Sequence, residues 1–105
     1  MPRKDNYKPS IMQEKCECYI CHAPYTVGLD HHHAVGGRNR KKSDEFALWI
    51  WLCRKCHSEL HDQGKHEKEI QADAEKAFIK DMRKKGYPEE ICREEWLRQF
   101  GKHYC

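Results

Sequence analysis

Apolar residues follow two different spacings along the chain, and the spacing in the first half predicts β-strands. The run at 46–52 is almost continuously apolar and aromatic, which is typical of a strand covered on both faces. Alternation along such a strand places Trp49 and Trp51 on one face, and the other face then carries Phe46, Leu48, Ile50 and Leu52. An earlier stretch, 25–35, is rich in β-favouring residues and ends at the glycine pair 36–37, so it predicts a partner strand.

Beyond Cys56 the apolar residues take the spacing of helices. A short helix after Cys56 is expected to end at Gly64, because glycine is the usual residue just past a helix. The segment 65–85 has an amphipathic pattern, with a stripe formed by Ile70, Ala74, Ala77 or Phe78, and Met82. A last helix should start at Pro88 and close at Gly101, with a stripe of Ile91, Trp96, Leu97 and Phe100. Both stripes are expected to pack against the strands.

Length and composition indicate one small α+β domain. The chain has 105 residues, of which 35% are charged and 38% hydrophobic, and its mean hydropathy is -1.07, so only a modest core is possible. Residues 1–13 lack periodicity and predict a flexible arm, whereas 14–105 form the domain, with a core at about 16–64 and a helical extension at 65–105. No run reaches transmembrane length, and no membrane association is expected.

The chain has seven cysteines, which indicate that more than the small core stabilises the domain. Domains with a small core often depend on bound metal or disulfide bonds. Cys18 with Cys21 and Cys53 with Cys56 form two Cys-x-x-Cys pairs, the spacing of a closed tetrahedral zinc site. Cys16 competes with Cys18 as a ligand, but its spacing to Cys21 is less usual. The odd cysteine count and the lack of an apolar leader favour a reduced, cytoplasmic chain with structural Zn²⁺.

Histidines predict a second metal site of a different kind. The run 30–33 reads Asp-His-His-His, and His57 and His61 follow at a helical i, i+4 spacing that lets two imidazoles share an ion. An ion held by two or three imidazoles leaves positions open for a phosphate oxygen and water, and a further histidine suits general-base work near neutral pH. The leading hypothesis for these histidines is therefore the hydrolysis of phosphodiester bonds with one metal ion. A second structural zinc site and a plain surface cluster are the alternatives.

Positive charge is modest in total but locally clustered. The formal net charge is +3, while four cations, Arg38, Arg40, Lys41 and Lys42, fall together in the predicted loop between the strands. Such a loop is either simply solvated or in contact with a nucleic-acid backbone beside the metal site. So small a basic surface predicts low sequence specificity.

The cysteine pairs, the Asp30 to His33 run, the Leu52-Cys53-x-x-Cys56-His57 stretch and His61 together resemble the HNH endonucleases of the ββα-metal type, in the subclass stapled by two Cys-x-x-Cys knuckles. The match covers 18–61. The resemblance implies a metal-dependent DNA endonuclease that uses Mg²⁺, Mn²⁺, Ni²⁺ or Zn²⁺, with helix ligands at His57 and His61. A looser likeness of 10–13, 36–41 and 100–104 to small phage and prophage HNH proteins implies a phage-encoded chain in a bacterial host, with phage or host protein partners and a homodimer as further expectations.

In that family two adjacent residues at the end of the first strand divide the work, the first binding metal and the second acting as base. Three pairs fit here: Asp30 with His31, His31 with His32, and His32 with His33. We expect His31 to be the ligand and His32 the base, with His33 in support and Asp30 as a further ligand. The family also carries an asparagine that shapes the site loop, and its expected position holds Leu48, so Asn39 is the candidate for that role. The principal alternative to an enzyme is a non-catalytic, zinc-stapled module that binds nucleic acid.

Overall fold

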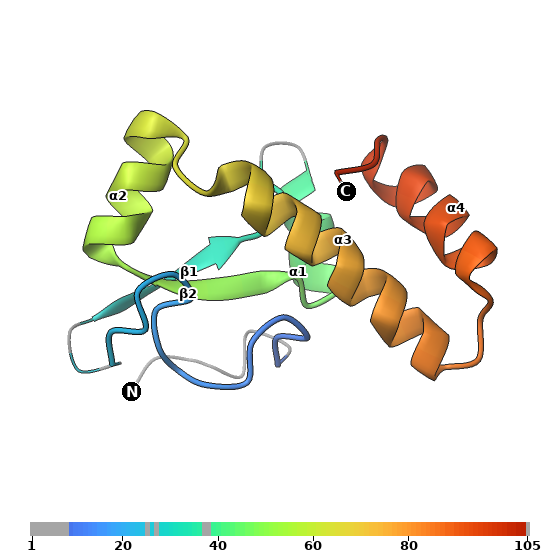
Figure 1. Ribbon diagram of the computed structural model, residues 1–105, viewed down its shortest axis with the longest axis horizontal. Coiled ribbons are helices and arrows are strands. Elements are labelled where there is room, and N and C mark those ends of the chain that lie inside the picture. Colours follow the sequence, from blue (N-terminus) through green and yellow to red (C-terminus); the bar gives the residue numbers. More distant parts are fainter. Residues whose placement is uncertain (1–8, 25, 27, 37–38, 105) are drawn as a thin grey trace.

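The computed structural model describes residues 9–24, 26, 28–36 and 39–104, and within these ranges it has a two-stranded antiparallel sheet and four helices (Figure 1). The predicted α+β class is confirmed. In chain order the elements are β1 (Leu29–His33), α1 (Arg40–Glu45), β2 (Trp49–Cys53), α2 (Arg54–Gln63), α3 (Glu67–Lys84) and α4 (Glu89–Phe100).

The two strands are shorter than the apolar pattern predicted. They pair from Leu29 opposite Cys53 to His33 opposite Trp49. β1 begins only after Gly28, whose φ of 85° turns the chain away from an extended path. β2 begins at Trp49 and not at residue 46, because Ala47 has a left-handed φ of 60° that interrupts the run. Residues 25 and 27 of the predicted first strand lie outside the described ranges.

The free edge of β2 is covered by the segment that precedes the sheet. The Ser10 hydroxyl donates to the Trp49 carbonyl, and the Trp51 amide donates to the side-chain oxygen of Gln13 over 2.9 Å. The Tyr19 amide donates to the Trp51 carbonyl at 2.7 Å. Ser10 and Gln13 of the expected arm therefore lie against the sheet, where their side chains make bonds that a third strand would otherwise supply. Residues 1–8 of that arm lie outside the described part of the chain.

The segment expected to be a charged hairpin loop is a helix in its second part. α1 covers Arg40–Glu45, and this correction follows from the good helix propensities of its arginine, lysines and glutamate. Ser43, which is fully buried, fixes α1 to the end of β1 by accepting from the Val35 amide at 3.1 Å and donating to the Val35 carbonyl at 2.7 Å. The sequence did not predict that Ser43 is buried, because serine is common in solvated loops.

The remaining helices start and stop close to the predicted residues. Gly64 and Gly101 have left-handed φ values of 67° and 86° just past α2 and α4, as the glycine positions predicted. Pro88 immediately precedes α4. One boundary differs from the prediction: α2 begins at Arg54, so Cys56 lies within the helix and does not precede it.

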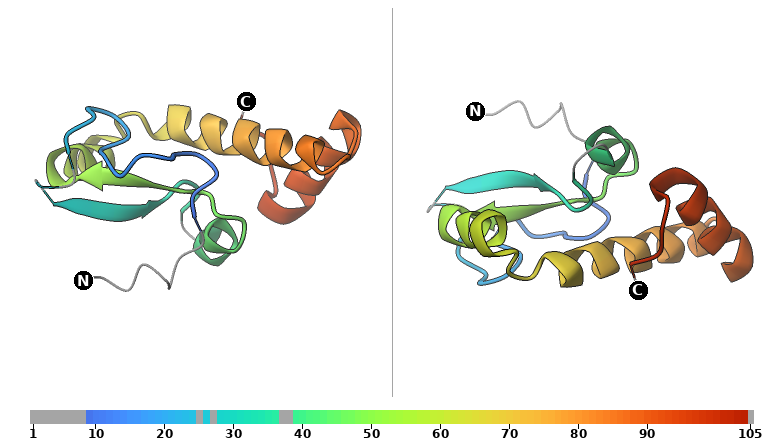
Figure 2. Two further views of the ribbon diagram at one scale, coloured as in Figure 1. Left: turned by 90° about the horizontal axis from the view of Figure 1, so that it is seen from below. Right: turned by 90° about the horizontal axis from the view of Figure 1, so that it is seen from above.

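α3 lies on one side of the sheet and α1 on the other, while α2 and α4 stand at opposite ends of the molecule (Figures 1 and 2). The core joins the sheet to α3 and α4 through Leu48, Ile50, Leu52, Ile70, Ala74, Phe78, Trp96 and Phe100. Ile91 and Leu97 were expected in the core stripe of α4, but each is 43% exposed. In the described ranges no helix is both long and apolar enough to cross a bilayer.

Candidate functional site

Four cysteines from three elements converge at one end of the sheet. Cys18 and Cys21 lie in the turn before β1, Cys53 ends β2, and Cys56 lies in the first turn of α2; their four sulfur atoms are within 4.8 Å of one another. Cys21 and Cys53 have an Sγ to Sγ distance of 3.7 Å, too long for a disulfide and close to the roughly 3.8 Å that two zinc–sulfur bonds of about 2.3 Å impose in a tetrahedron. The predicted cysteine set is thus brought together and is compatible with structural zinc.

The turn around Cys18 favours a thiolate. Burial by itself raises the pKa of this thiol, but hydrogen bonds from the backbone around Cys53, Cys21 and Ile20 outweigh it and lower the pKa to about 6. Burial raises the pKa of Cys56 well above its usual range. A zinc ion held by the four cysteines would reverse that shift, since a coordinated thiol is deprotonated.

Three histidines form a second group of potential ligands, across the sheet from the tryptophans. His32 projects from β1 toward α2, where His57 and His61 lie one turn apart, and one ring nitrogen from each lies within 4.8 Å of the others. The Nε2 atoms of His57 and His61 face each other at 3.0 Å. Two zinc–nitrogen bonds of about 2.05 Å would set such atoms roughly 3.3 Å apart, so a small adjustment accommodates an ion.

Asp30 supports this group from the same face of β1. Its Oδ2 lies 3.0 Å from Nδ1 of His57, which holds the ring with Nε2 directed at His61. Carboxylates in this position fix the tautomer and orientation of metal-binding histidines. Burial, followed by the nearby rings of His57 and His61, lowers the pKa of His32 to about 4, so the ring is neutral and able to coordinate at physiological pH.

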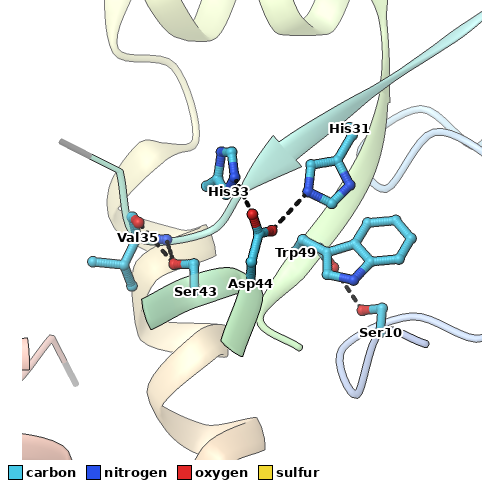
Figure 3. Close-up of polar contacts among 7 residues, drawn as sticks. All are labelled: Ser10, His31, His33, Val35, Ser43, Asp44 and Trp49. Carbon is cyan, nitrogen blue, oxygen red and sulfur yellow. Dashed lines mark hydrogen bonds and ion pairs between the residues drawn. The ribbon is translucent and has the colours of Figure 1, made fainter. Parts of the chain in front are cut away.

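A different set of residues meets on the opposite face of β1 (Figure 3). His31 and His33 each place Nε2 3.0 Å from a carboxylate oxygen of Asp44, which α1 brings beneath the strand. His31 also lies over Trp49, with ring centroids 4.5 Å apart. Burial lowers the pKa of His31, with Asp44 opposing the shift.

The structure does not bring the expected ligand set together: His32, and not His31, lies with His57 and His61. Alternation along β1 points His32 toward α2, whereas His31 points to α1. The sequence could not show which of the three candidate pairs is correct, because the two residues of each pair point to opposite faces of the strand. The position of α2 decides which face carries the candidate ligands. Asp30 contacts a ligand of the histidine group and lies outside the group itself.

Two residues near the site were not identified from the sequence. Ser43 ties the loop after β1 to α1, the kind of loop-shaping role expected of Asn39, and Asp44 orients His31 and His33. Asn39 directly precedes α1 and makes no side-chain capping bond there. Ser43 and Asp44 directly follow the run of cations in the sequence, but serine and aspartate are ordinary loop residues and give no signal of their own.

A hollow of about 420 Å³ joins the two histidine groups, and it is lined by His31, His32, His33, Gly36, Arg40, His57 and His61. Of the four predicted phosphate-contacting cations, Arg40 borders this hollow and Lys41 is exposed on α1. Lys42 instead donates to the Gln99 carbonyl at 2.7 Å, near the end of α4, and so has a structural contact. Arg38 lies outside the described residues.

Comparisons of the chain with protein-family models, with curated proteins and with solved structures gave no match. The resemblance to HNH endonucleases therefore stays an expectation drawn from the residues.

Proposed function

We propose that the chain is a metal-dependent endonuclease of the ββα-metal type, which hydrolyses phosphodiester bonds of DNA with one divalent ion and a histidine base. The observation that carries this proposal is the convergence of His32, His57 and His61 beside His33 at one hollow. Two antiparallel strands followed by a helix that carries two of the candidate ligands support the proposal. The cysteine group serves as the staple for this small domain, because it links the turn before β1 to the start of α2.

In this proposal His32, His57 and His61 hold the ion, and Asp30 keeps His57 in position. A divalent ion bound there supplies Lewis-acid stabilisation of the charge that develops on the scissile phosphate and the leaving 3′ oxygen. An all-imidazole ligand set suits Zn²⁺, Ni²⁺ or Co²⁺ better than Mg²⁺, which prefers oxygen ligands.

His33 is the general base. In neutral His33, Nε2–H donates to Asp44, so the lone pair on Nδ1 is available to take a proton from the attacking water. Asp44 keeps the ring in this tautomer and stabilises the imidazolium that forms. The pair of His32 as ligand and His33 as base replaces the favoured pair of His31 and His32.

Substrate binding in this proposal depends on phosphate contacts. Arg40 lines the hollow and Lys41 is exposed on the same helix, so both can meet the backbone on either side of the scissile bond. Contacts of this kind carry no base readout, which agrees with the expected low sequence specificity.

The test is conversion of supercoiled plasmid to nicked or linear DNA by the zinc-stapled protein supplied with Ni²⁺, Mn²⁺, Zn²⁺ or Mg²⁺. We expect cleavage by the wild type and by His22→Ala, a control histidine paired with Glu17 away from the hollow, and loss of cleavage in His61→Ala. DNA binding without cleavage under every metal would contradict the enzyme and favour the non-catalytic binding module.

A further inference from the structure

The group formed by His31, His33 and Asp44 has the composition of a metal site in its own right. Two imidazole nitrogens and a carboxylate oxygen lie within 4.8 Å of one another, and both imidazoles point toward Asp44 (Figure 3). Strand alternation places this group on the face of β1 opposite His32. Two histidines with one carboxylate are a common donor set for Zn²⁺, Ni²⁺ and Fe²⁺. The proposed function uses His33 and Asp44 but gives His31 no task.

The distances in this group suit coordination with little rearrangement. Each Nε2 is 3.0 Å from its own oxygen of Asp44, while a tetrahedral ion with bonds of about 2.05 Å needs ligand atoms roughly 3.3 Å apart. The two imidazole nitrogens and one carboxylate oxygen already lie within 4.8 Å of one another, and rotation of the Asp44 side chain can bring them to an ion. The same comparison holds for the Nε2 atoms of His57 and His61, which also lie 3.0 Å apart.

The surroundings hold the donors in place and leave access for an ion. The ring of His31 is nearly covered and lies against Trp49, and Ser43 anchors α1 beside the group. The Asp44 side chain is 42% exposed, so an ion can reach the group from solvent and keep water as its fourth ligand. By contrast, the His22 and Glu17 pair, at 2.6 Å, has one imidazole and belongs to no group of three donors among the described residues.

We propose that His31, His33 and Asp44 form a second divalent-cation site, and that its occupation inhibits the enzyme by withdrawing His33 from catalysis. A neutral imidazole has one ring nitrogen with a free lone pair. If Nε2 of His33 gives its lone pair to the ion, the ring proton resides on Nδ1, which then cannot accept a proton from water. Excess Zn²⁺ therefore inhibits cleavage, a consequence that rests on the proposed role of His33 as base.

Binding is tested by equilibrium dialysis of the intact protein against Zn²⁺, with metal and protein quantified together. The wild type should take up one equivalent for each of the three donor groups. His31→Phe keeps an aromatic ring against Trp49 but removes the nitrogen, so it should lose one equivalent, whereas His22→Ala should lose none. Asp44→Asn, which is nearly isosteric, should also lose the third equivalent, and its far-ultraviolet circular dichroism shows whether the fold is kept.

Inhibition is tested in the plasmid assay by raising Zn²⁺ beyond the concentration that gives the highest rate. The wild-type rate should fall by about 10-fold or more, as expected when a general base worth about 10²–10⁴-fold is blocked in most molecules. His31→Phe should keep its rate at the same Zn²⁺ concentration. Two equivalents in the wild type, or three in both the wild type and His31→Phe, would refute the second site. If no protein cleaves plasmid, the proposed function fails, and dialysis alone still decides whether the site exists.

Discussion

Ser43→Ala removes one oxygen atom that fixes the loop between the site histidines and α1. The hydroxyl accepts from the Val35 amide at 3.1 Å and donates to the Val35 carbonyl at 2.7 Å, and the Ser43 side chain is fully buried. The variant leaves both backbone groups without this partner in a dry environment. An unsatisfied buried polar group costs about 1–3 kcal/mol, so the free energy of unfolding should fall by roughly 2–4 kcal/mol.

The assay is urea unfolding of the zinc-loaded protein, followed by circular dichroism. The control is Ser58→Ala, because the Ser58 hydroxyl makes an exposed 3.3 Å contact with Asp62, and its loss should change stability by less than about 0.5 kcal/mol. Since Ser43 also aligns α1, Ser43→Ala should lower the cleavage rate while zinc stays bound to the cysteines. Equal stability of the two variants would refute the interpretation of Ser43 as the loop anchor.

Three further predictions address the staple, the histidines and the cations. Cys53→Ser should unfold the domain at neutral pH, as seen by circular dichroism, because a structural zinc site contributes about 10–16 kcal/mol in small domains, as much as their whole stability. When zinc is bound only at the cysteines, the free energy of unfolding should be highest above pH 6.5 and should fall toward pH 4, because the pKa of His32 is about 4 in the folded protein against an ordinary 6.5. After allowance for the partial exposure of His32, this loss is about 2 kcal/mol. Urea titrations of His32→Gln should not show this loss. Lys41→Ala should reduce the slope of log affinity against log salt by about 0.9 in DNA-binding titrations, whereas Lys42→Ala, which loses its bond to Gln99, should lower stability and leave the slope unchanged.

The parts of the fold that depend on local patterns were predictable. Gly64, Gly101 and Pro88 mark helix boundaries through their own backbone preferences, and the structure places the boundaries there. The cysteine pairs were likewise readable, because their spacing is itself the signal of a shared tetrahedral ion.

The parts that depend on tertiary placement were not predictable. Nothing in the sequence of α1 shows that Ser43 is buried, since its contact with Val35 exists only once the chain turns back on β1. Three consecutive histidines could not be assigned roles because a strand sends neighbours to opposite faces, and the faces are defined by α2 and α1. Likewise, Ile91 and Leu97 fit a helical stripe, but α4 contacts α3 through Trp96 and Phe100 instead.

The most direct test of the central claim is the plasmid cleavage rate of His33→Ala, measured together with the metal bound at His32, His57 and His61. His33 lies on the other face of β1 from those ligands, so its loss should leave their ion in place and lower the rate by about 10²–10⁴-fold. Cleavage at the wild-type rate by metal-loaded His33→Ala would contradict the assignment of His33 as the base.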